Sequence, residues 1–199
     1  MKKLIIITLL VIPTIAGAQD FDKNLASART AYGAGKLEDA RFAMEQMLRD
    51  LDIAIGKEIV KMLPVKLGTL DYIAKADNVT GGSGSITGLF VHREYGMQPK
   101  SGSVEIMKNS PMISSLSAML SNPIMGGMMR DENQKMVKIQ GYKSILNKVV
   151  NTETGKTNYE LQIPMNNTLV TLKMDDSNEG EITAAANGIP LAKIVQMAQ

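Results

Sequence analysis

Hydrophobic residues recur with helical spacing over the first third of the chain. Between residues 22 and 63 they return every three or four positions in two segments, which are separated by Gly33, Ala34 and Gly35. Pro64 follows, and proline ends a helix because it lacks the backbone donor and clashes with the preceding turn. The pattern predicts a helical hairpin over residues 19–63, whose longer helix runs from about Leu37 to Leu63.

Four residues of this segment have the spacing of one tetratricopeptide-type helix pair, which the segment resembles: Ala28, Tyr32, Gly35 and Ala40. Repeats of this type need neighbouring repeats to bury their apolar faces. Because one pair is not an array, we expect an ordinary helical hairpin docked on the rest of the protein.

From residue 64 onward the apolar positions alternate with polar ones, which indicates strands that have one buried face. Gly, Asn and Pro residues separate these alternating segments and predict short turns between them. We expect strands at residues 67–76, 86–95, 103–108, 136–140 leading into 142–150, 157–163 and 168–174. On the last of these, Val170, Leu172 and Met174 share one face, and Leu169 lies on the other.

Helices are expected within and after these strands. Ser110 and Pro111 form a typical helix start, and Asn122-Pro123 ends that helix. Asp176 or Ser177 is expected to cap a second helix through Ala186, and Pro190 begins a last short one. The sequence therefore predicts an α+β fold with an N-terminal helical hairpin, a mostly antiparallel sheet of about six strands with one inserted helix, and C-terminal helices. Its sheet domain would span residues 64–199.

The first eighteen residues have the pattern of a secretory signal peptide. Lys2 and Lys3 precede an apolar run from Leu4 to Ile15, and Ala16-Gly17-Ala18 provides small residues at the positions that a signal peptidase reads. The apolar run is too short to cross a bilayer as a helix. We expect residues 1–18 to be removed and the protein to be periplasmic or secreted. With no later apolar run of spanning length, no integral membrane segment is expected after removal.

Charge and composition exclude several functions. Lys2 and Lys3 account for the excess of 22 basic over 20 acidic residues, so the mature chain is neutral and no nucleic-acid partner is expected. The chain has no Cys and one His, which removes disulfides and zinc binding. No phosphate-binding loop or Gly-x-Ser-x-Gly motif is present. We therefore expect neither an enzyme nor a cofactor.

Two polar features of the sequence are candidates for chemistry. His92 lies in a strand pattern, where a surface or half-buried side chain is expected rather than a catalytic base. Four acids fall within seven residues, and they can be a calcium site, a glycosidase pair or first-turn residues that favour the helix dipole: Asp175, Asp176, Glu179 and Glu181. The spacing does not match the twelve-residue calcium loop, so the helix-dipole interpretation is favoured.

Methionine is the unusual residue type, with 15 in the chain. Eight lie between residues 97 and 136, where methionine can fill the core, form an adaptable apolar surface, or bind copper(I) through its thioether sulfurs. We predict an apolar binding surface made of the helix and the loop after it. Its candidate ligand-binding residues are Met112, Leu116, Met119, Met125, Met128 and Met129.

The sequence thus predicts an exported, non-enzymatic binding or interaction protein of the bacterial cell envelope. It would hold an apolar ligand or a segment of an envelope protein at the methionine-rich helix and loop, and the helical hairpin is a second candidate for contacting partners. The alternative is a methionine-based copper(I)-binding protein or chaperone, in which Met125, Met128 and Met129 would be the copper ligands. A hydrolase using the clustered carboxylates is a third possibility.

Overall fold

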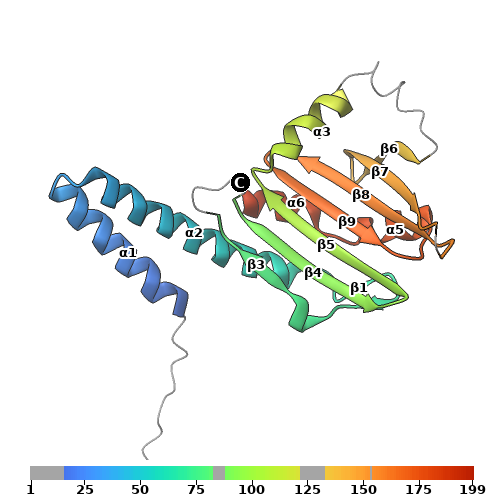
Figure 1. Cartoon of the computed structure of the whole chain (residues 1–199), viewed down its shortest axis with the longest axis horizontal. Helices are drawn as coiled ribbons and strands as arrows, with labels where there is room; N and C mark the ends of the chain where they lie inside the picture. The colour runs from blue at the N-terminus through green and yellow to red at the C-terminus, as the bar shows by residue number, and fades with distance from the viewer. Residues whose placement is uncertain (1–15, 83–87, 122–132, 153) are drawn as a thin grey trace, which may run out of the picture. The chain divides into compact units, whose positions relative to one another are not determined.

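The computed structural model describes residues 16–82, 88–121, 133–152 and 154–199. The chain divides into two compact units after Met47, and helix α2 runs from one unit into the other. The fold is of the α+β class, as predicted (Figure 1). Among the described residues, no helix combines the length and the apolar character that crossing a membrane requires.

The predicted helical hairpin is confirmed. Helix α1 (Ala16–Gly33) and helix α2 (Leu37–Met62) flank a turn in which Gly35 has a φ of +73°, a conformation that glycine adopts without strain. Helix α2 ends one residue before the predicted limit. Helix α1 begins at Ala16, six residues earlier than its apolar spacing indicated. Residues 1–15, which carry most of the expected signal peptide, lie outside the described residues.

The second unit is built on a seven-stranded antiparallel sheet with the strand order β3-β4-β5-β9-β8-β7-β6. Successive strands β6 to β9 form the predicted meander, and β9 also pairs with β5, which joins the meander to the β3-β4-β5 group. The sheet strands are β3 (Asn78–Thr80), β4 (Phe90–Met97), β5 (Lys100–Lys108), β6 (Gln134–Ile139), β7 (Tyr142–Val150), β8 (Thr157–Met165) and β9 (Thr168–Met174).

One predicted strand differs from the structure. In place of one strand over residues 67–76, the structure has a small hairpin whose two strands contain two residues each, β1 (Lys66–Leu67) and β2 (Leu70–Asp71). The short 3-10 helix η1 (Ala74–Ala76) follows. The reason is Gly68, whose φ of +61° turns the chain after two residues. Leu67 and Leu70 still reach the core, so the apolar pattern is satisfied by a hairpin instead of one strand.

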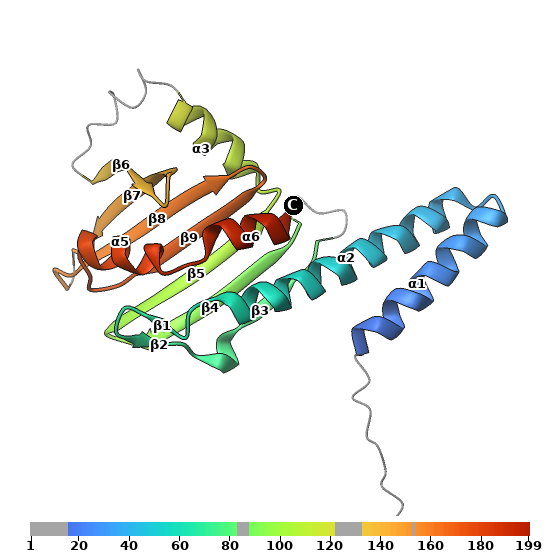
Figure 2. The same cartoon turned by 180° about the vertical axis from the view of Figure 1, so that it is seen from behind.

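Helices cover one face of the sheet and form the main core with it (Figure 2). They are α5 (Glu179–Asn187), α6 (Leu191–Ala198) and the C-terminal part of α2. The buried residues of β9 on this face are Val170, Leu172 and Met174, as predicted, whereas Leu169 belongs to a separate cluster. The N-cap of α5 is Asn178, whose side chain accepts a hydrogen bond from the backbone of Glu181. The predicted caps Asp176 and Ser177 are therefore wrong by one or two residues.

Candidate functional site

The sheet has a second face, opposite the main core, and we call it the open face. Side chains of alternate residues on every strand point to it, because successive residues of a strand face opposite sides. The antiparallel register aligns them into rows that run from strand to strand. One row crosses all seven strands, from β3 to β6, through Asn78, His92, Glu105, Thr171, Gln162, Ile145 and Met136.

A neighbouring row on the open face is apolar, and helix α3 (Pro111–Ser121) packs near it. The row consists of Phe90, Met107, Leu169 and Pro164. Three residues of α3, Ile113, Leu116 and Leu120, form an apolar cluster with Ile145 and Leu169 of the sheet. We call this group the α3 cluster. It is distinct from the main core and lies on the other face of the sheet.

Over β4, β5 and β9, the open face beyond this apolar row is polar. His92 lies between two carboxylates, with Nε2 3.4 Å from Glu94 Oε1 and Nδ1 3.6 Å from Glu105 Oε1. Glu105 is also 3.5 Å from Lys173 Nζ. The side chains of His92 and Glu105 are each 21% exposed, so His92 is half-buried, as predicted. The charges of Lys173 and Glu105 thus compensate each other within the sheet face.

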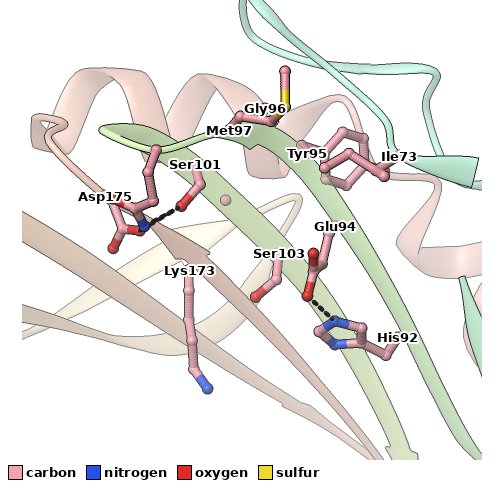
Figure 3. Close-up of a pocket in the computed structure, with 12 residues that line it drawn as sticks. Ile73, His92, Glu94, Tyr95, Gly96, Met97, Ser101, Ser103, Lys173 and Asp175 are labelled. Atoms are coloured by element: carbon pink, nitrogen blue, oxygen red, sulfur yellow. Dashed lines mark hydrogen bonds and ion pairs between the residues drawn. The ribbon is translucent and has the colours of Figure 1, made fainter. Parts of the chain in front are cut away.

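A depression of about 410 Å³ lies beside these groups, where β4, β5 and β9 run together (Figure 3). Glu94, Ser103 and Lys173 line one part of it, and Ser101 and Asp175 line another. Its size is within the range of small-molecule sites, about 300 to 1,000 Å³. The lining offers an ammonium, two carboxylates and two hydroxyls, a set that can bind a polar group of either charge.

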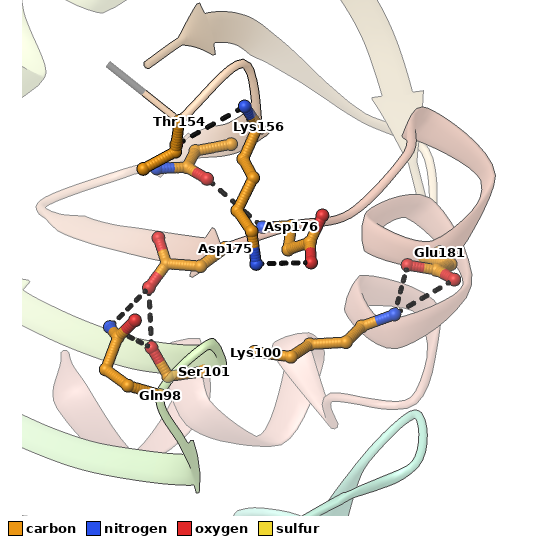
Figure 4. A network of polar contacts seen from close by, with 9 residues as sticks. Gln98, Lys100, Ser101, Thr154, Lys156, Asp175, Asp176 and Glu181 are labelled. Atoms are coloured by element: carbon orange, nitrogen blue, oxygen red, sulfur yellow. Dashed lines mark hydrogen bonds and ion pairs between the residues drawn. The ribbon is translucent and has the colours of Figure 1, made fainter. Parts of the chain in front are cut away.

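A network of polar contacts continues from this depression to the end of the sheet (Figure 4). Asp175 Oδ2 accepts hydrogen bonds from Ser101 Oγ at 2.5 Å and Gln98 Nε2 at 3.3 Å. Lys156 Nζ donates to Asp176 Oδ2 at 2.8 Å, and this bond lowers the pKa of the Asp176 carboxyl below its ordinary value. A smaller depression of about 280 Å³ shares Gln98 and Asp175 with the first.

The four clustered acids do not converge on a common site. Lys135 contacts Glu179, Lys100 Nζ lies 3.1 Å from Glu181 Oε2, and Asp176 is bound to Lys156. Glu179 and Glu181 occupy the first turn of α5, where acids interact favourably with the helix dipole. The helix-dipole interpretation is thereby confirmed for those two. Within the described ranges, no group of three or more His, Asp or Glu residues is arranged to hold a metal ion.

The six predicted ligand-binding residues have different positions. Leu116 is buried in the α3 cluster and Met119 packs against it, whereas Met112 is 47% exposed on the same helix. The structure thus brings Leu116 and Met119 together against the sheet and leaves Met112 toward solvent. Met125, Met128 and Met129 lie outside the described residues.

Sequence reasoning missed most of the polar open face. Glu94, Glu105 and Lys173 were not singled out, because they lie far apart in the sequence and meet only through the pairing of β4, β5 and β9. The available signal was the alternation itself, since these residues occupy the polar positions of strands whose apolar positions were assigned to the core. The order of the strands was needed to join them.

Comparison with known proteins adds no relative: no known protein family, curated protein or solved structure matches the chain. The site therefore has to be interpreted from its own geometry.

Proposed function

We propose that this protein is an exported, non-enzymatic binding protein of the bacterial cell envelope, which holds an acyl chain between α3 and the open face of the sheet. The observation that carries the proposal is the α3 cluster. It is a second apolar cluster, on the face opposite the main core, and α3 supplies its cover. The sheet domain has its principal core without this helix, so α3 is available for another role.

The contacts of α3 support such a role. Three side chains of its eleven residues are buried, and each of them remains 7–8% exposed. Segments with few buried contacts open locally at lower free energy than the core strands of a protein. An apolar chain that enters between α3 and the sheet residues Met107 and Leu169 would replace contacts within the α3 cluster by contacts of the same kind.

The neighbouring rows argue for an amphipathic ligand rather than a purely apolar one. The apolar row of Phe90 and Met107 adjoins the polar row of His92 and Glu105 on the same face. Lys173 and Glu94 follow one row further. An acyl chain under α3 would therefore place its polar head over groups that can donate and accept hydrogen bonds.

Export is supported by the N-terminal pattern. Lys2 and Lys3, the apolar run and the small residues at 16–18 together fit a signal peptide. A neutral mature chain without cysteine is compatible with a protein that binds its ligand by burying apolar surface and by hydrogen bonds. The open face has the apolar and polar side chains for both.

Fluorescence of cis-parinaric acid tests the proposal. We expect the wild-type protein to bind this fatty acid and Leu116→Lys to lose binding, because the variant places a charge within the α3 cluster. Val65→Lys is the control: it introduces the same charge at an apolar residue that is 64% exposed and belongs neither to the α3 cluster nor to the lining of either depression. Circular dichroism verifies that both variants are folded. A folded wild-type protein that takes up no fatty acid would refute the proposal, and methionine-dependent copper(I) affinity would then favour the alternative.

A further inference from the structure

Charge is distributed unevenly over the sheet, although basic and acidic residues balance in the chain without residues 1–18. Strands β6 and β7, with the turn between them, contain four lysines and no acidic residue: Lys135, Lys138, Lys143 and Lys148. Extending this segment back to residue 130 adds one basic and two acidic residues, which leaves a net charge of +3. Glutamates of the open face lie on other strands, Glu94 on β4, Glu105 on β5 and Glu160 on β8. Since β6 is the last strand of the sheet (Figure 1), this edge is basic.

We call residues 134–150 the β6–β7 edge. One of its lysines is compensated by a neighbouring carboxylate, because Lys135 contacts Glu179 of α5. The other three lysines are exposed, and none of them has a carboxylate within ion-pair distance among the described residues: Lys138, Lys143 and Lys148. Their charges are therefore available to an anionic partner outside the chain.

Two of these lysines are held next to each other on the open face. Lys138 and Lys143 are directly opposite in the pairing of β6 with β7, two residues along each strand from Met136 and Ile145. Like charges in this position destabilise a strand pair, so both ammonium groups would gain from a shared anion. Lys143 Nζ donates to the Leu120 carbonyl of α3 at 3.3 Å, which uses one of its three donors. The basic pair thus lies beside the C-terminal end of α3.

Exposed apolar side chains accompany the lysines. Met136 lies on the open face beside Lys138 and is 45% exposed, and Val149 near the other end of β7 is 55% exposed. Membrane-surface binding combines burial of apolar area with electrostatic attraction to anionic lipids. The β6–β7 edge offers both, whereas a soluble anion would use the charges alone.

We propose that the β6–β7 edge docks on an anionic phospholipid surface, with Lys138, Lys143 and Lys148 at the level of the lipid phosphates. Lys148 projects from the opposite side of β7 to Lys143, because successive residues of a strand alternate between faces. An edge-on approach is therefore the one that brings all three lysines to the lipids. Each lysine near an anionic membrane surface raises affinity about fivefold, so three of them give reversible docking.

Docking in this orientation goes beyond the proposed function and does not depend on it. It would bring the end of α3 to the lipids, since Lys143 contacts Leu120 and Ile145 of the same strand belongs to the α3 cluster. An acyl chain held under α3 would then be close to the membrane with which it exchanges. Docking on vesicles by a protein that takes up no cis-parinaric acid would support this inference and refute the proposed function.

Co-sedimentation of the whole exported chain with sucrose-loaded vesicles tests the proposal. We expect binding to vesicles of equal parts phosphatidylglycerol and phosphatidylcholine, and much weaker binding to phosphatidylcholine alone. Added salt should weaken the binding, because ions screen exposed charges. Lys138→Gln/Lys143→Gln should bind about 25-fold more weakly, from about fivefold for each lysine. A wild-type protein that stays in the supernatant with the anionic vesicles would overturn the proposal.

The matched control removes the same charge at the opposite edge of the sheet. Lys57 of α2 and Lys75 of η1 are exposed, and these elements pack near β3 and β4. We expect Lys57→Gln/Lys75→Gln to bind anionic vesicles with wild-type affinity, and circular dichroism verifies that both double variants are folded. An equal loss in the two double variants would show dependence on net charge rather than on the β6–β7 edge, and would overturn the proposal.

A single cysteine reports the orientation, since the chain has none of its own. Met136→Cys and Val65→Cys are each labelled with the environment-sensitive fluorophore NBD. Vesicles containing phosphatidylglycerol should increase and blue-shift the emission at residue 136 and leave it unchanged at residue 65, which is 64% exposed outside the β6–β7 edge. An equal response at both positions, or a response at residue 65 alone, would exclude docking through this edge.

Discussion

The guanidinium of Arg93 is bound by both carboxylate oxygens of Asp77, with Nε–Oδ1 at 2.8 Å and Nη2–Oδ2 at 2.6 Å. Arg93 lies on the core face of β4 and is only 5% exposed. Its Nη1 donates to the Leu63 carbonyl at 3.2 Å, and its Cζ lies 4.6 Å from the centre of the Tyr72 ring. Neighbouring Tyr95 donates its hydroxyl to the Pro64 carbonyl at 2.9 Å. Two inward-pointing polar residues of one strand thus bind the chain where α2 ends.

Removing the carboxylate from this pair should be strongly destabilising. Asp77→Ala leaves the charge of Arg93 buried without its partner, and we expect a loss of about 3 to 5 kcal/mol in the free energy of unfolding in urea. The double variant Arg93→Met/Asp77→Ala removes both charges and should recover part of this loss. If the loss of unfolding free energy in the double variant equalled the sum of the losses in Arg93→Met and Asp77→Ala, the interaction energy between the two side chains would be zero.

Tyr95 should make stability depend on alkaline pH. Burial raises the pKa of its hydroxyl from 10.0 to about 12, although the nearby Arg93 charge opposes this shift. The folded state then holds the proton more tightly than the unfolded state. The stabilisation is fully present below about pH 10 and is lost as the pH rises toward about 12, by about 2 to 3 kcal/mol in total.

Urea unfolding of the wild type and Tyr95→Phe across this range provides the measurement. Subtracting the variant's free energy from that of the wild type cancels the titration of lysines, which both proteins share. The difference should be about 1 kcal/mol in favour of the wild type at neutral pH, for the lost hydrogen bond, and should fall above pH 10. If the unfolding free energies of the two proteins changed in parallel with pH, the pKa of Tyr95 would be the same in the folded and the unfolded state.

Two helical glycines should respond in opposite ways to alanine. A Cβ at Gly56 of α2 would collide with Val79 Cγ1 and lie 2.8 Å from Leu89 Cδ1, where the helix packs closely on β3 and β4. A Cβ at Gly33 of α1 would have no atom within 4 Å. We expect Gly56→Ala to destabilise by about 1 to 3 kcal/mol and Gly33→Ala to stabilise by up to about 1 kcal/mol. Thermal unfolding distinguishes them; stabilisation by both would show that the sheet adjusts freely.

The fold class and most elements follow from local patterns. In helix α2 and strands β6 to β9, apolar residues recur with the spacing of a helix or a strand. Residues such as Pro64 end these elements, and both signals lie within a few residues of one another in the sequence. The β1-β2 hairpin was missed because two apolar positions around Gly68 suit a continuous strand equally well. The paired residues of β5 and β9 are 60 to 72 positions apart in the sequence, and no local pattern contains this pairing.

The candidate site was less accessible to sequence reasoning. The burial of Leu116 followed from the spacing of α3, but which sheet face it meets depends on the strand order. The burial of Arg93 could not be predicted, since its partners Asp77 and Leu63 come from separate elements. His92 was expected to be half-buried, and its two carboxylate neighbours emerge only from the register of β4 with β5.

Helix α3 should open more readily than the sheet on which it packs. Among the described residues, its buried side chains belong to the α3 cluster and not to the main core, whereas β9 is paired on both sides and carries main-core residues. We therefore expect amide hydrogens of α3 to exchange faster than those of β9 in the wild-type protein. Leu116→Ala should accelerate exchange in α3 further and leave β9 unchanged.

The loss of global stability in Leu116→Ala shows whether α3 opens separately from the sheet. A buried leucine replaced by alanine usually costs about 2 to 5 kcal/mol, but the loss here is limited to the free energy that holds α3 on the sheet. We expect a smaller decrease in global stability, measured by urea unfolding followed through the sheet signal. Met112→Ala is the matched control, since Met112 is exposed on the same helix and should alter neither quantity. A full leucine-to-alanine cost, with α3 and β9 exchanging at one rate, would show that α3 belongs to the cooperative core and does not open separately from it.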